Sequence, residues 1–147
     1  MILFQKKSVL SVKDDKTNII HKFSVPENIG ALKIKYEYSP KEVADRELAV
    51  NLIKDCFKKY DEHIVGRPSD YLPVKNLLTL SLDDKKTYRG ASHRQSNNQE
   101  ILISADNATA GYEKGDITPG QWAAVISVHS ISCDVEYKLQ VEGEEIQ

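Results

Sequence analysis

The densest group of side chains suited to binding chemistry lies between Asp83 and Arg94. Arg89, His93 and Arg94 follow the carboxylates of Asp83 and Asp84. Guanidinium groups pair with carboxylates and phosphates through two parallel hydrogen bonds, so this segment is a candidate site for an anionic ligand. The alternative is structural: Arg89 ties down its own loop through Asp83 or through backbone carbonyls, as ion-pair networks often do. We favour the structural alternative.

A second candidate binding element is the glycine-rich segment 108–122, which reads Ala-Thr-Ala-Gly-Tyr-Glu-Lys-Gly-Asp-Ile-Thr-Pro-Gly-Gln-Trp. Tyr112 and Asp116 lie in it and join Arg89 and its neighbours as tentative ligand-binding or partner-binding residues. Its glycines allow positive φ angles, and Pro119 before Gly120 is typical of a type II turn that leads into a strand. The segment is therefore first of all a folding device, whose final tryptophan would cover the end of the core.

Oxygen-bearing side chains around this turn suggest a calcium site. Their spacing matches no defined calcium loop, and such side chains commonly cap their own backbone, so turn chemistry is our interpretation. The histidines are too far apart in sequence to give a local pair of metal ligands, and we expect no metal. The oxygen-bearing residues are Asp106, Asn107, Glu113 and Asp116, and the histidines are His21, His63, His93 and His129.

A hydrolytic centre can be assembled from neighbouring serines and histidines. His93 or His129 would serve as the base, and the nucleophile would come from the adjacent serines Ser92, Ser130 or Ser132. Neighbouring residues of a strand point to opposite faces, so adjacency in sequence is weak evidence for a catalytic pair. We therefore expect no catalytic residue, no enzyme activity and no cofactor.

Five aromatic residues might be thought to form a platform for a carbohydrate ring. Most of them fall on the inward phase of their strands, which makes core packing the better interpretation. They are Tyr36, Tyr38, Tyr112, Trp122 and Tyr137.

Short strands must position these residues. In the segment 31–38, Leu32 and Ile34 alternate with Lys33 and Lys35, which is typical of a strand buried on one face. About seven such segments joined by turns favour two packed antiparallel sheets over a βαβ architecture, and we predict a jelly-roll-like antiparallel β-sandwich. The segments are 3–12, 18–25, 31–38, 74–82, 100–104, 122–129 and 133–141.

One helix is predicted within this strand-rich chain. From residue 41 to about 60, Val43, Leu48 and Leu52 follow helical spacing among charged residues. We expect this inserted amphipathic helix to cap an end or an open edge of the sheets, and residues 61–73 to form an exposed loop. Residues 1–141 would form the single domain, and residues 142–147 a frayed tail.

The composition fits one domain that folds without covalent staples. The chain has 147 residues, and its 20 basic and 22 acidic side chains give a formal charge of −2. No overall positive field draws it towards nucleic acids or acidic membranes. Cys56 and Cys133 match no zinc or disulfide pattern, so we expect reduced, buried thiols. No segment suits a signal peptide or a membrane span, and we expect a cytoplasmic protein.

The second half of the chain is similar to a known family. The pair Arg89-Gly90, a small polar stretch and Arg94 precede the Ala-Thr-x-Gly-Tyr-x-x-Gly-x-Ile-x-Pro-Gly-x-Trp pattern of residues 108–122. These residues resemble the N-terminal β-sandwich domain of carbaryl-hydrolase-like members of the PHP (polymerase and histidinol phosphatase) metallohydrolases. The resemblance covers about residues 76–141. Ala91 stands where the family usually has an aromatic residue.

The resemblance implies a function without catalysis. The metal ligands of the family lie in a later domain that begins with a His-x-His pair, and this chain ends before such a domain. The implied function is a non-catalytic accessory or interaction domain that joins a PHP-type hydrolase on a separate chain or associates with itself. The residues themselves leave another function open: a module that binds a small ligand, an anion or a carbohydrate through segments 89–94 and 111–120.

Overall fold

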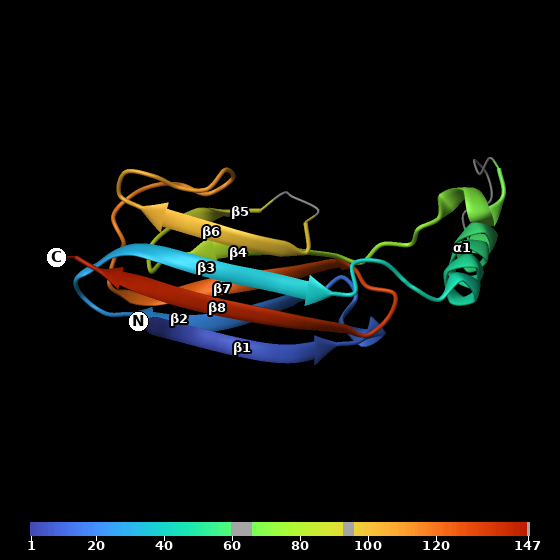
Figure 1. The fold of residues 1–147 in the computed structure, drawn as a ribbon, viewed down its shortest axis with the longest axis horizontal. Helices are drawn as coiled ribbons and strands as arrows, with labels where there is room; N and C mark the ends of the chain where they lie inside the picture. The colour runs from blue at the N-terminus through green and yellow to red at the C-terminus, as the bar shows by residue number, and fades with distance from the viewer. Residues whose placement is uncertain (60–65, 93–95, 147) are drawn as a thin grey trace.

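Two four-stranded antiparallel sheets pack face to face, and a helix lies beyond one end of them (Figure 1). The structure is a computed structural model that describes residues 1–59, 66–92 and 96–146. The first sheet has the strand order β1-β8-β3-β6, and the second sheet has the order β2-β7-β4-β5. The strands are β1 (Ile2–Leu10), β2 (Asn18–Val25), β3 (Ile29–Ser39), β4 (Leu77–Asp83), β5 (Tyr88–Ala91), β6 (Asn98–Ser104), β7 (Gly120–Ser130) and β8 (Val135–Glu145).

This arrangement of eight strands in two sheets is that of a jelly roll, which is built from two Greek keys. The chain crosses repeatedly between the sheets, so each of its halves contributes strands to both layers. The predicted jelly-roll-like β-sandwich is confirmed.

The core between the sheets follows from the alternation seen in the sequence. Leu32, Ile34 and Tyr36 of β3 point inward and are buried, while Lys35 and Glu37 face outward. The same pattern holds along β8 and β7, and burial of these apolar side chains is the main term that stabilises the fold. All five aromatic residues weighed as a carbohydrate platform lie in the core, as the inward phase predicted.

The strand β5 was not among the seven predicted segments. It has only four residues, with Arg89 and Gly90 at its centre, so it carries no alternating apolar pattern. Gly90 has a φ of +110°, and a Cβ atom there would collide with the carbonyl oxygen of Gly111. The glycine is thus needed because the turn around Gly111 approaches the strand closely.

The inserted helix α1 is shorter than predicted, covering Arg46–Lys59 rather than starting at Lys41. Its first turn begins after Asp45, whose carboxylate accepts a hydrogen bond from the backbone N–H of Leu48 at 3.1 Å. Residues 41–43 are extended instead of helical because they pair with the chain that returns to the sandwich. Val43 N–H donates to Val74 O, and Asn76 N–H donates to Lys41 O, each at 2.8 Å.

The prediction that this helix caps the sheets is wrong. Figure 1 places α1 beyond the end of the sandwich, at the end opposite both termini. Its buried residues Ala49 and Ile53 lie on one face, and the helix packs mainly against the 3-10 helix η3 (Pro68–Tyr71), where Phe57 meets Tyr71 edge to face. Helix α1 and η3 thus form a separate excursion, here called the α1 excursion, which spans residues 41–76.

Two further predictions need correction. The strand β8 continues beyond Val141 to Glu145, because Gly143 N–H donates to Met1 O and the strand pairs with β3 up to Ile29. Most of the predicted tail is therefore part of the sheet. Both cysteines are free thiols, but neither is fully buried as predicted: Cys56 on α1 is exposed, and Cys133 is partly exposed.

Of the helices in the described ranges, none combines the length and apolar character needed to cross a membrane.

Candidate ligand-binding groove

Arg89, the central residue of the predicted anion site, is buried and occupied by its own loop. Its Nη1 donates to the Asp84 carboxylate at 3.2 Å and to the Asp116 carbonyl at 3.1 Å. Its Nη2 donates to the carbonyls of Glu113 and Gly115 at 3.2 and 3.1 Å. The guanidinium also lies over the Trp122 ring, 5.2 Å from its centroid. These contacts support the structural interpretation, with Asp84 in place of Asp83 as the carboxylate.

The Arg89–Asp84 ion pair is shielded from water, since each side chain is only 6% exposed. Burial raises the pKa of the Asp84 carboxyl, but hydrogen bonds from the Lys86 and Thr87 backbone and from Arg89 outweigh it, so the net pKa is lowered. Asp84 is thus held in its charged form. One arginine fastens β5 to the turn of residues 113–116.

Tyr112, another residue of the predicted set, is likewise buried. Its hydroxyl donates to Leu80 O at 2.8 Å and lies 2.6 Å from Ser92 Oγ. Burial raises the pKa of the Tyr112 hydroxyl to about 12. Asp116 contributes its backbone carbonyl to Arg89, while its side chain is exposed. His93 and Arg94 lie outside the described residues.

Two other kinds of site were considered from the sequence, a serine–histidine catalytic pair and a metal site. Ser92 is buried and its Oγ contacts the Tyr112 hydroxyl, while His129 Nε2 lies 2.8 Å from Thr79 Oγ1, so Ser92 and His129 do not form a nucleophile–base pair. Among residues 1–59, 66–92 and 96–146, no group of three or more His, Cys, Asp or Glu side chains gathers as metal ligands would.

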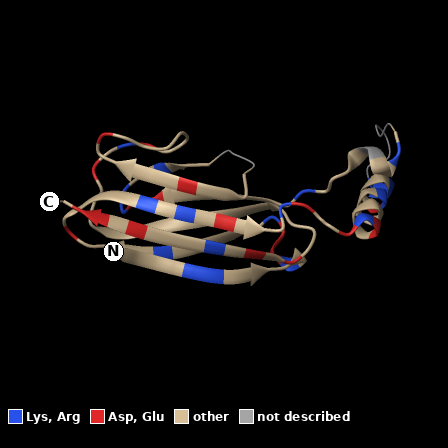
Figure 2. Ribbon diagram, viewed as in Figure 1, with Lys and Arg blue, Asp and Glu red and all other residues tan. Residues whose placement is uncertain are grey.

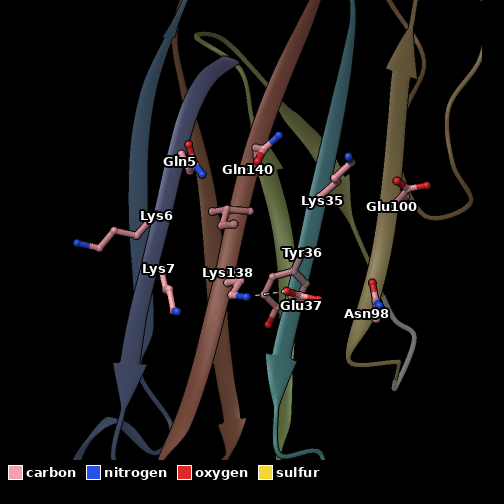
Figure 3. A pocket seen from close by; sticks show the side chains of 11 residues that line it. Gln5, Lys6, Lys7, Lys35, Tyr36, Glu37, Asn98, Glu100, Lys138 and Gln140 are labelled. Carbon is pink, nitrogen blue, oxygen red and sulfur yellow. Dashed lines mark ion pairs between the residues drawn. The ribbon is translucent and has the colours of Figure 1, made fainter. Parts of the chain in front are cut away.

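A hollow lies elsewhere, on the outer face of the first sheet. Figure 3 shows this groove, of about 800 Å³, crossed by side chains from β1, β8, β3 and β6. The backbone of Tyr36 and Leu139 forms part of its floor, since the side chains of these two residues are buried on the opposite, core-facing side of the sheet. The polar lining residues are Gln5, Lys6, Lys7, Lys35, Glu37, Asn98, Glu100, Lys138 and Gln140.

The strand register arranges these side chains in two rows across the sheet. In one row Gln5 faces Gln140, which faces Lys35, and Lys35 faces Glu100. In the neighbouring row Lys7 faces Lys138, Lys138 faces Glu37, and Glu37 faces Asn98. Directly opposed side chains in a sheet lie about 4.5–5.5 Å apart at Cβ, so groups from four strands converge on a small area.

Positive charge exceeds negative charge in this groove. On the outward-facing positions, three lysines, Lys7, Lys35 and Lys138, lie with two carboxylates, Glu37 and Glu100, whereas Lys6 pairs with the core residue Leu139 and points to the other side of the sheet. Lys138 pairs with Glu37 at 3.6 Å, and Lys7 pairs with Glu136 at 3.4 Å, all with half-exposed side chains. Lys35 makes no ion pair with any described residue. Lys7 and Lys138 lie directly opposite each other, and each is paired with a carboxylate that offsets the repulsion between the two ammonium groups.

Sequence reasoning missed this groove. It identified the outward positions of β3 and β8 as wet, but Lys7 and Lys138 are far apart in the chain and meet only through the register of β1 on β8. The sequence did show lysines at outward positions of several separate strands, and this was the signal that could have pointed to the groove.

No family model matches the chain, and no curated protein is similar enough to serve as a relative.

Proposed function

We propose that this domain is a non-catalytic module that binds a small anionic sugar in the groove of the first sheet. The observation that carries the proposal is the convergence of Lys7, Lys35 and Lys138 with the amides of Gln5 and Gln140. Lysine ammonium groups attract a carboxylate or phosphate, and side-chain amides both donate to and accept from hydroxyl groups.

The ligand chemistry follows from what lines the groove. Neutral sugars are usually held by exposed aromatic faces, but the only ring among the lining residues is Tyr36, which is 1% exposed and turned to the core. Binding must then come from charge and hydrogen bonds. The excess of ammonium groups favours an anion, while Glu37 and Glu100 at the far side accept hydrogen bonds from hydroxyls.

A matched pair of ligands tests this proposal. Glucuronate and glucose differ in one carboxylate, and inorganic phosphate tests whether charge alone suffices. In a thermal-unfolding assay, glucuronate at about a hundredfold excess over its Kd stabilises the fold by roughly 2.7 kcal/mol, and glucose has no effect. This stabilisation by glucuronate falls as the salt concentration rises, because exposed charges are screened within about 8 Å at physiological ionic strength.

Single lysine variants locate the site. Lys35→Gln removes a groove ammonium that has no described ion-pair partner, and we expect glucuronate affinity to fall roughly tenfold. Lys114→Gln is the matched control, because Lys114 lies in segment 108–122, away from the groove. Equal losses from both variants, or stabilisation by glucose as strong as by glucuronate, would refute the groove as the anion site.

The association with a PHP-type hydrolase stays a prediction that rests on the resemblance of residues 108–122. It is tested by mixing the chain with such an enzyme and following a shift in size-exclusion elution. Anionic-sugar binding does not depend on that result, since the groove lies on a different part of the domain from that segment.

A further inference from the structure

The outer face of the second sheet differs chemically from that of the first. Its central row runs Ile20, Val125, Ser81 and Ala91 across β2, β7, β4 and β5. The next positions on β7 and β4 are Ala123, Ser127 and Thr79, again small and uncharged. Ile20 is 59% exposed, although it is a large aliphatic side chain.

The two faces are easily compared. Figure 2 shows that Lys, Arg, Asp and Glu recur along the strands of the first sheet, so the outer face of this sheet is charged. On the outer positions of the second sheet, within the described strands, the Lys, Arg, Asp and Glu residues are Lys22 and Asp83. An exposed sheet face with few charges and small side chains suits flat packing against another protein surface.

The two charges lie in a self-complementary position. Lys22 of β2 and Asp83 of β4 both face Ala123 of β7, so they occupy the same row on either side of the central strand. Consider two copies whose second sheets face each other, related by a twofold axis that lies midway between the two sheets and runs parallel to β7. In this arrangement β2 of one copy lies over β4 of the other. Lys22 of each copy then meets Asp83 of the other, as an isologous interface requires.

We propose that two copies of this chain associate through the outer faces of their second sheets, with Lys22 of each paired to Asp83 of the other. Charge complementarity selects a second copy as the occupant, because one face supplies both members of the pair at matching distances from β7. The groove of the first sheet stays open on the outside of such a dimer, so the inference is independent of sugar binding.

Charge reversal tests the pairing in the full chain. Sedimentation at about 100 μM gives a dimer for the wild type. Lys22→Asp or Asp83→Lys alone places like charges together at two symmetric contacts and weakens the dimer at least about tenfold. The double variant Lys22→Asp/Asp83→Lys restores opposite charges and recovers the wild-type dimer affinity.

A second pair of variants tests the face without altering its charge pair. Val125→Lys puts a charge at the centre of the interface and gives a monomer, whereas Val9→Lys, on the outer face of the first sheet, leaves the dimer intact. Circular dichroism confirms that each variant is folded. A monomeric wild type, a dimer that survives Val125→Lys, or a double variant as weak as the single ones overturns the proposal.

Discussion

The Tyr137 hydroxyl of β8 lies 2.8 Å from Nε2 of His21 on β2, so one hydrogen bond joins the two sheets through the core. Nδ1 of His21 lies 3.1 Å from the Ala124 carbonyl. Because a carbonyl only accepts, Nδ1 carries a proton. Burial lowers the pKa of His21 below the ordinary 6.5, so at neutral pH the imidazole is uncharged and Nε2 accepts from the Tyr137 hydroxyl.

This neutral histidine makes stability depend on pH. The unfolded chain binds a proton at His21 more readily than the folded chain, so the free energy of unfolding rises with pH in that window. Its contribution is complete above the unfolded pKa of 6.5 and is lost as pH falls from there towards the lower folded pKa. We expect a loss of at most about 1.4 kcal/mol per pH unit within the window, measured by urea denaturation.

His21→Gln is expected to remove this slope between pH 6.5 and the folded pKa, and His129→Gln serves as a control because His129 is exposed. The same slope in wild type and His21→Gln would mean that another group titrates.

Two buried tyrosines are expected to respond oppositely to loss of their hydroxyls. The Tyr36 hydroxyl has no hydrogen-bond partner among the described residues, whereas that of Tyr112 contacts Leu80 O and Ser92 Oγ. Tyr36→Phe should leave the free energy of unfolding unchanged or raise it by about 1 kcal/mol, while Tyr112→Phe should lower it by roughly 1–3 kcal/mol. Chemical denaturation measures both, and a larger loss from Tyr36→Phe would contradict this account.

Arg89 is expected to matter for stability. In Arg89→Lys an ammonium group replaces the planar fork that satisfies Asp84 and three carbonyls, so the free energy of unfolding should fall by roughly 3 kcal/mol. Arg46→Lys on the exposed side of α1 should change it by less than about 0.5 kcal/mol. Glucuronate affinity at a temperature where both variants are folded should equal that of the wild type. A tenfold weaker Kd in Arg89→Lys alone would return the ligand site to the 89–94 loop.

The sandwich itself was predictable because its strands are buried on one face and therefore alternate. The residues 31–38 and 133–141 carry this alternation clearly; the first segment lies within β3, and the second overlaps β8 from Val135 onward. The strand β5 was not predictable in the same way, since Arg89 points inward and finds its partners in a turn that begins more than twenty positions later. An inward arginine breaks the pattern from which strands are recognised.

Neither the position of α1 nor the groove could be predicted from the sequence, because both depend on pairing between segments that are far apart in the chain. The periodicity of residues 46–59 predicts a helix but contains nothing about its surroundings, which are set by the pairing of Lys41 with Asn76. The groove likewise depends on which strand lies beside which. Outward lysines can be found from sequence, but their convergence requires the order β1-β8-β3-β6.

The α1 excursion is expected to be dispensable for folding of the sandwich. Val43 and Val74 are joined by a 2.8 Å backbone hydrogen bond, and Glu42 pairs with Lys75, so a hairpin can close the gap. Replacing residues 44–73 by Asn-Gly, the preferred two-residue hairpin turn, should leave cooperative unfolding and a stability within about 1 kcal/mol of the full chain. Loss of cooperative unfolding would mean that α1 supports the core.

Binding in the groove of the first sheet is tested most directly by following the amide NMR spectrum of the full chain during titration with glucuronate. The account predicts saturable shifts for amides around Gln5, Lys35, Lys138 and Gln140, with none along the outer face of the second sheet. It also predicts that glucose leaves these signals in place. Shifts confined to the 113–116 turn and its Arg89 contacts, or no shifts at all, would contradict it.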